Sequence, residues 1–124
     1  MYNNDSSVGV ESDLVNSYAW DTAIVFIQAM GNGNENYANK TSVNSSLANT
    51  GTTGDEVCNI HDMASNCIEW STEYSTHTGS SNAYPCVTRG GRCYDSYGYT
   101  AHRHGNSATL KYSGNSFRLA LYVK

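Results

Sequence analysis

The residues that could do chemistry gather in residues 87–105, VTRGGRCYDSYGYTAHRHG, which hold three tyrosines, three arginines and two histidines. His102 and His104 form an H-x-H pair, which on a strand would share one face and could bind a metal ion. No Cys, Asp or Glu follows at the spacing that metal sites normally use, so the pattern favours exposed histidines. We predict no metal and no cofactor.

Cysteine chemistry is the second candidate. The four cysteines are Cys58, Cys67, Cys86 and Cys93, and none of them forms a C-x-x-C pair. Three disulfide pairings are open, but we expect small buried thiols rather than two disulfides. The sequence His61-Asp62 close to Cys58 suggests a nucleophile with a base, yet nothing indicates an oxyanion site. We therefore predict no catalytic residue.

The composition indicates one domain over residues 1–124 with a binding surface. Ten tyrosines stand against two phenylalanines and two tryptophans, and the mean hydropathy of −0.52 is that of a polar globular chain. Tyrosine offers a large contact area with a polar tip and few rotatable bonds, which is why binding surfaces are rich in it. Six of the ten tyrosines lie between Tyr74 and Tyr112.

Charge is divided unevenly along the chain. Residues 1–88 carry one basic and ten acidic side chains, whereas residues 89–124 carry six basic and one acidic. We expect the two parts to attract each other, and the net charge of −4 argues against nucleic acid as a partner. No apolar run reaches the roughly 18 residues of a membrane span, and no signal peptide is present in this sequence. We expect no membrane insertion. The location of the protein stays open, and the cell surface, the exterior of the cell and a virion are the candidates.

The elements that must position these side chains begin with one helix. Residues 17–30, SYAWDTAIVFIQAM, place Ser17 at the N-cap, and Gly31 follows as a stop signal. Trp20, Ala23, Ile24, Ile27 and Met30 recur at helical spacing. Val25 and Phe26 widen the apolar arc, so the pattern predicts a well-buried helix.

The rest of the chain reads as a long polar loop followed by strands. Residues 31–55 are rich in Asn, Ser, Thr and Gly and predict an ordered loop with a short turn. Alternation predicts strands in residues 66–71 and 116–124, and Pro85 indicates the entry from a loop into a further strand. One helix and late antiparallel strands indicate an α+β fold.

Several of these segments together carry a family resemblance. DMASNCIEWS (62–71) resembles the D-x-x-G-N-V-W-E-W motif of the formylglycine-generating-enzyme-like superfamily. TRGG (88–91) is similar to its R-G-G, AHR (101–103) to its small residue before arginine, and FR (117–118) to its closing G-F-R strand. SYAWDTA is similar to its capped Trp-bearing helix. Ser65 and Ile68 depart from the motif, where the family has Gly and Trp.

The resemblance implies a C-type-lectin-like fold with short antiparallel strands and long loops. It also implies that the chain lacks the family's N-terminal strands, so we expect a homo-oligomer or a partner chain to complete the fold. The residues that the resemblance and the charge pattern give to the scaffold are Asn66, Glu69, Trp70, Arg89, Gly90, Gly91, Arg103, Phe117 and Arg118. We expect the three arginines to pair with acidic residues such as Asp62 and Glu69, with ligand contact as the alternative.

The family's oxidases hold copper with two cysteines, and the matching positions here are Asp95 and Thr100. One cysteine, Cys93, does not supply the thiolate pair that copper(I) prefers. The resemblance points instead to the branch of phage and bacterial proteins that are diversified by retroelements and bind ligands. It implies a Tyr-rich variable surface for a protein or cell-surface ligand, with the copper-dependent oxidase as the alternative. The predicted ligand-binding residues are Arg92, Tyr94, Asp95, Tyr97, Tyr99, His102, His104 and Asn106.

Overall fold

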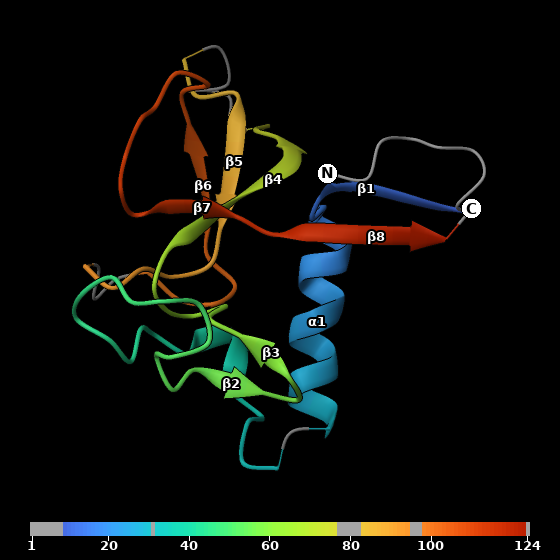
Figure 1. Cartoon of the computed structure of the whole chain (residues 1–124), viewed down its shortest axis with the longest axis vertical. Coiled ribbons are helices and arrows are strands. Elements are labelled where there is room, and N and C mark those ends of the chain that lie inside the picture. The colour runs from blue at the N-terminus through green and yellow to red at the C-terminus, as the bar shows by residue number, and fades with distance from the viewer. Residues whose placement is uncertain (1–8, 31, 77–82, 95–97, 124) are drawn as a thin grey trace.

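The chain has an α+β fold, as the sequence predicts (Figure 1). The computed structural model describes residues 9–30, 32–76, 83–94 and 98–123. Within these residues the elements are β1 (Val10–Leu14), α1 (Ser17–Met30), the 3₁₀ turn η1 (Tyr37–Asn39), β2 (Glu56–Val57), β3 (Ile60–His61), β4 (Ile68–Tyr74), β5 (Cys86–Arg89), β6 (Arg103–Asn106), β7 (Asn115–Phe117) and β8 (Leu119–Val123).

The strands form three groups. A four-stranded sheet has the order β6-β5-β4-β7, in which β4 and β7 run parallel and the other neighbours antiparallel. β1 and β8 form a separate antiparallel ribbon, and β2 and β3 form a short hairpin. The single strand predicted over residues 116–124 is therefore wrong: at Arg118 the chain leaves the sheet and enters the ribbon, and the Arg118 carbonyl accepts the amide of Val15 (2.9 Å).

Helix α1 has the predicted bounds but a different cap and a narrower buried face. The cap is Asn16, whose Oδ1 accepts the Ala19 amide at 2.8 Å, whereas the Ser17 hydroxyl donates to Glu73. Val25 is 65% exposed and Phe26 47% exposed, so the prediction that they widen the buried arc is wrong. The reason is spatial: η1 and the β2–β3 hairpin lie along one side of α1, and the ribbon crosses near its start (Figure 1).

The core forms where α1 meets the double glycine. Trp20 is completely buried, and its indole Nε1 donates to the carbonyl of Thr100 at 3.0 Å. Gly90 has φ +86°, and a Cβ added there would lie 2.5 Å from the Met63 carbonyl and 2.9 Å from the Trp20 ring. A Cβ on Gly91 would overlap the Ala64 carbonyl. Both glycines thus permit a backbone approach that no other residue allows.

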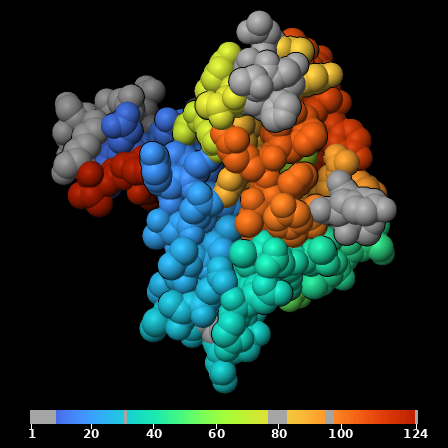
Figure 2. Space-filling view, turned by 180° about the vertical axis from the view of Figure 1, so that it is seen from behind, coloured from blue at the N-terminus to red at the C-terminus, as the bar shows by residue number. Residues whose placement is uncertain are grey.

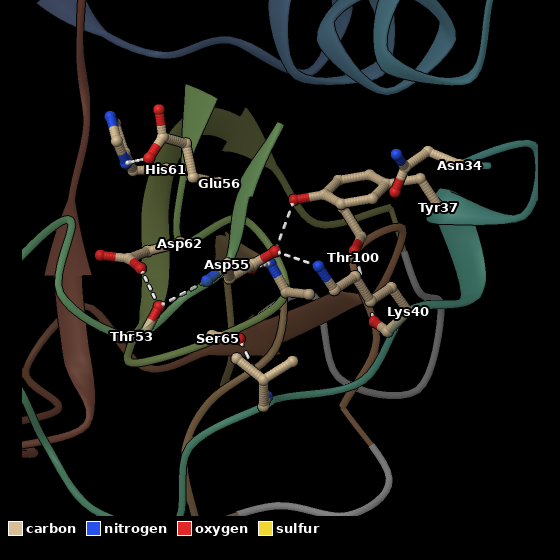
Figure 3. Close-up of polar contacts among 12 residues, drawn as sticks. Asn34, Tyr37, Lys40, Thr53, Asp55, Glu56, His61, Asp62, Ser65 and Thr100 are labelled. Atoms are coloured by element: carbon tan, nitrogen blue, oxygen red, sulfur yellow. Dashed lines mark hydrogen bonds and ion pairs between the residues drawn. The ribbon is translucent and has the colours of Figure 1, made fainter. Parts of the chain in front are cut away.

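The polar loop before β2 is tied down by buried hydrogen bonds (Figure 3). The Asp55 carboxylate accepts from the Tyr37 hydroxyl (3.0 Å), the Lys40 ammonium (2.7 Å) and the Ala64 amide (2.8 Å). Burial, followed by the charge of Asp55, raises the pKa of Tyr37 far above its ordinary value, so the phenol stays a donor. Asp62 accepts from the Gly51 amide (2.8 Å) and from a threonine hydroxyl of the same loop. This loop is therefore ordered.

All four cysteines are unpaired, in agreement with the sequence prediction. Their burial differs from that prediction, however. Cys93 is buried, Cys67 and Cys86 are half-buried, and Cys58 is exposed because it lies in the turn that joins β2 to β3.

Candidate ligand-binding site

One of the predicted ion pairs between an arginine and an acidic residue stabilises the scaffold. Arg118 donates from Nε and Nη2 to the two carboxylate oxygens of Glu69, at 2.8 and 2.9 Å, and from Nη2 to the carbonyl of His61 at 2.7 Å. Burial is the largest effect on the pKa of Glu69 and raises it, while Arg118 opposes that rise. The expected partnership between Arg118 and Glu69 is confirmed.

The other two arginines find partners that the sequence did not predict. Arg89 pairs with Asp21 of α1, and Arg103 pairs with Glu73 of β4. Asp62 pairs with neither, because it is used by the polar loop. Arg89 thus connects the sheet to α1, while Arg103 links two strands of the sheet, and both contacts fit a scaffold role.

Strand register places the two arginines on the opposite face of the β5–β6 ladder from His104. Arg89 of β5 lies opposite Arg103 of β6, and the next pair along the same ladder is Thr88 opposite His104. Because successive side chains point to opposite faces of a strand, His104 lies on the face away from the arginine pairs. Thr88 is buried on that face.

A pocket of about 210 Å³ opens on the His104 face of the sheet. Its lining residues are Ile68, Arg92, His102, His104, Asn106, Leu110, Tyr112 and Asn115. Four of the eight predicted ligand-binding side chains are among them. A second depression of about 560 Å³ shares His104 and Asn106 and continues toward Tyr84. The fold therefore brings the four predicted side chains, which come from two separate segments of the chain, to one pocket.

Ring contacts connect the pocket to its surroundings. The Arg92 guanidinium lies over the Tyr112 ring, 5.1 Å from its centroid. The His102 ring is 5.4 Å from that of Tyr99 and 5.8 Å from that of His104, with both pairs tilted. The rings of Tyr99, His102 and His104 therefore lie next to one another. Figure 2 shows the orange surface of this part of the chain above the loop that follows α1.

The remaining predicted residues fall into three cases. Tyr94 is 53% exposed and Tyr99 is 40% exposed, so both have rings available for contact. Asp95 and Tyr97 lie outside the described residues. Asn106 is buried, and its amide donates to the Thr88 hydroxyl at 2.7 Å, so it supports the pocket wall instead of offering an exposed group.

Sequence reasoning missed four lining residues. Two of them carried a signal in the sequence. The alternation of residues 66–71 puts Ile68 on the same strand face as Trp70, and Tyr112 belongs to the Tyr-rich region. Leu110 and Asn115 carried no signal, because only the return of the chain along β7 brings them to the pocket. The Oδ1 and Nδ2 atoms of Asn115 are buried and have no hydrogen-bond partner among the described residues.

No group of three or more His, Cys, Asp or Glu side chains is placed to hold a metal ion in the part that the structure describes. In the same residues, no helix combines the length and apolar character needed to cross a membrane.

Comparison with known proteins gives one informative likeness. No protein-family model matches the chain. No curated protein sequence matches it either. The crystal structure of CarF is similar, with a TM-score of 0.68 and 17% sequence identity over 91% of this chain and 47% of the CarF chain. At this identity the likeness shows a shared fold alone. The chain spans about half the length of CarF.

Proposed function

We propose that this chain is a ligand-recognition protein that presents exchangeable side chains of residues 92–106 on a C-type-lectin-like scaffold. In its finer form, the proposal is a retroelement-diversified variable protein similar to the formylglycine-generating-enzyme-like superfamily. The observation that carries it is the pocket, where Arg92, His102 and His104 converge although they come from separate segments.

The backbone around the pocket supports recognition by side chains alone. Gly90 donates its amide to the His102 carbonyl at 3.1 Å, and β6 is paired to β5 over four residues. A fixed backbone keeps the entropy loss on binding small, because only side chains must be ordered. Tyr94 and Tyr99 add exposed ring area at the margin.

The copper-dependent oxidase is the alternative. Of the two positions that match the family's cysteines, Thr100 is completely buried, and its hydroxyl donates to the Lys40 carbonyl at 3.3 Å. We expect no thiol oxidation of a cysteine-containing peptide when copper(I) is supplied. Oxidation that disappears in Cys93→Ser would establish the enzyme instead.

The proposal includes a second chain, either another copy or a partner. Leu119, Leu121 and Val123 lie on one face of β8 and are exposed, as are Val25 and Met30 on α1. Large exposed apolar patches commonly mark contacts between proteins. These side chains support the expectation that another chain completes the fold.

A library experiment tests the recognition function. Positions 92, 94, 99, 102 and 104 are randomised together, and the variants are selected against lysozyme as an arbitrary protein target. Tyr94, Tyr99 and His104 are exposed, and substitutions at exposed positions usually change stability by less than about 0.5 kcal/mol each, so we expect most variants still to unfold cooperatively. We also expect selected variants to bind lysozyme while the starting protein does not.

Asn106→Ala is the matched control, because its buried amide should make the melting temperature fall. If most library members fail to unfold cooperatively, these side chains hold the fold together and the proposal is wrong. Sequencing natural copies of the gene tests the diversified form. We expect variation concentrated at codons 92–106, and variation spread evenly over the gene would contradict it.

A further inference from the structure

Two of the four free cysteines, Cys67 and Cys93, belong to neighbouring backbone segments. The Cys93 amide donates to the carbonyl of Asn66, the residue before Cys67, at 3.1 Å. With standard covalent geometry, this hydrogen bond brings the Cα atoms of the two cysteines within about 7 Å of each other. The Cα atoms of disulfide-bonded cysteines lie roughly 4.4–6.8 Å apart. The separation of the two backbones is therefore compatible with a disulfide.

The two side chains are also close together. Burial is the largest effect that raises the pKa of the Cys67 thiol, and the next is the charge of Cys93. Both sulfurs act on Tyr94 as well: desolvation raises the pKa of its hydroxyl, followed by Cys93 and, more weakly, by Cys67. Effects of this kind require groups that are near one another. Both thiols therefore lie in the same part of the fold, near the Tyr94 hydroxyl.

Hydrogen bonds hold both backbone segments in place. The Asn66 side chain accepts the Ala48 amide and donates to the Ala48 carbonyl, both at 3.0 Å. On the other segment, the Gly91 amide donates to the Met63 carbonyl at 3.3 Å. Because the fold keeps the two thiols together, their effective concentration for reaction with each other is high.

The other two cysteines lie elsewhere in the fold. Cys58 is exposed in the turn between β2 and β3. Cys86 begins β5, where it lies opposite Tyr74 on one side and Asn106 on the other. These two cysteines therefore provide a control within the same chain.

We propose that Cys67 and Cys93 are a redox pair, which a small-molecule disulfide such as glutathione disulfide converts into an intramolecular disulfide. The half-buried Cys67 thiol loses its proton and attacks one sulfur of glutathione disulfide, which releases one glutathione thiolate. The Cys93 thiolate then attacks the Cys67 sulfur of this mixed disulfide and releases the second glutathione thiolate. The protein loses two protons and two electrons, and one glutathione disulfide becomes two glutathione thiols.

The disulfide connects two parts of the pocket wall. Cys93 lies between Arg92, which lines the pocket, and Tyr94, whose ring is exposed. Cys67 directly precedes Ile68, which also lines the pocket and begins β4. Oxidation therefore ties residues 92–94 to the start of β4. The redox pair concerns the chain's own thiols, so it stands whether or not the pocket binds a ligand.

The test incubates the folded chain with glutathione disulfide at about pH 8.5, where a large fraction of an ordinary thiol is ionised. A metal chelator is present, so that copper takes no part. The variant Cys58→Ser with Cys86→Ser keeps only the proposed pair. We expect its mass to fall by about 2 Da, because two hydrogen atoms are lost. Mass spectrometry should find its tryptic peptides 41–89 and 93–103 linked to each other.

The matched variant is Cys67→Ser with Cys93→Ser, which keeps the other two thiols. It should form at least tenfold less intramolecular disulfide under the same conditions. In the variant that keeps the pair, the disulfide should form at least tenfold more favourably in the folded chain than in urea. Its oxidised form should then melt at least about 4 °C above the reduced form.

Equal disulfide formation in the two variants would overturn the proposal, and so would an oxidised form that melts below the reduced one. If a variant does not fold, the wild-type chain is oxidised and its disulfides are located by fragmentation of the linked peptides. A bond between Cys67 and Cys93 is the expected result there, and its absence or a different pairing would overturn the proposal.

Discussion

Arg118→Leu should be among the most damaging single substitutions in the scaffold, because it leaves the Glu69 carboxylate buried without its partner. The Glu69 side chain is 9% exposed and that of Arg118 is 30% exposed. Removing one member of a buried ion pair costs about 3–5 kcal/mol. Because water can reach part of Arg118, we expect a loss near the lower end, about 3 kcal/mol at pH 7. Domains typically have 5–15 kcal/mol of stability in total, so the loss should be easily measured.

The pH dependence of this loss identifies its cause. Burial already raises the pKa of Glu69, and without Arg118 it should rise further. A carboxyl whose folded-state pKa exceeds its unfolded value binds protons more strongly in the folded state. The loss in Arg118→Leu should therefore be largest above the folded-state pKa and should shrink as the pH falls toward the unfolded value near 4.5.

Urea unfolding followed by tryptophan fluorescence at pH 7 and pH 5 measures both effects. The double variant Glu69→Gln with Arg118→Leu removes the buried charge, so its stability should change less between these pH values than that of Arg118→Leu. Lys111→Leu, at an exposed residue, serves as the control, with an expected change below about 0.5 kcal/mol. A loss under about 1 kcal/mol for Arg118→Leu, or one that grows as the pH falls, would refute the reasoning.

Three further predictions use other parts of the scaffold. Gly91→Ala should lower the free energy of unfolding by about 3 kcal/mol in urea titrations, because its Cβ would overlap the Ala64 carbonyl; full stability would show that the close approach is absent. Asn16→Ala should cost about 1 kcal/mol in thermal melts through loss of the helix cap; no change would mean that the cap is not used. A thiol reagent should modify exposed Cys58 rapidly and buried Cys93 only after unfolding, and equal rates would contradict their burial.

Much of the local structure could be predicted because it depends on short-range chemistry. The apolar spacing from Trp20 to Met30 located α1, alternation located β4, and Pro85 marked the entry to β5. The pairing of Arg118 with Glu69 agrees with the expectation that the uneven charge along the chain gave, namely that the arginines pair with acids such as Asp62 and Glu69.

Other features depend on what lies next to each element, which periodicity does not report. The pattern shows that Val25 and Phe26 are apolar. It does not show whether another element packs over them, and in the structure both side chains are exposed. The same limit explains the division of residues 116–124: alternation continues through Arg118, whereas the backbone changes partners there.

The candidate site shows the same division. Residue types singled out Arg92, His102 and His104, which do share a pocket. Asn106 was of the same type, yet its position opposite Cys86 in β5 buries it. Asn115 could not be predicted, because its role depends on the parallel pairing of β7 with β4.

The scaffold and the candidate site depend on one strand register. In the β5–β6 ladder, Arg89 and Arg103 lie on the face where they pair with Asp21 and Glu73, while His104, one position along β6, lies on the other face and lines the pocket. A shift of one residue would exchange the two faces, placing the arginines in the pocket and the histidine against the anchoring acids. The register of this ladder therefore decides which side chains of residues 103–106 line the pocket, and the arginine pairs favour the observed register because they form only in it.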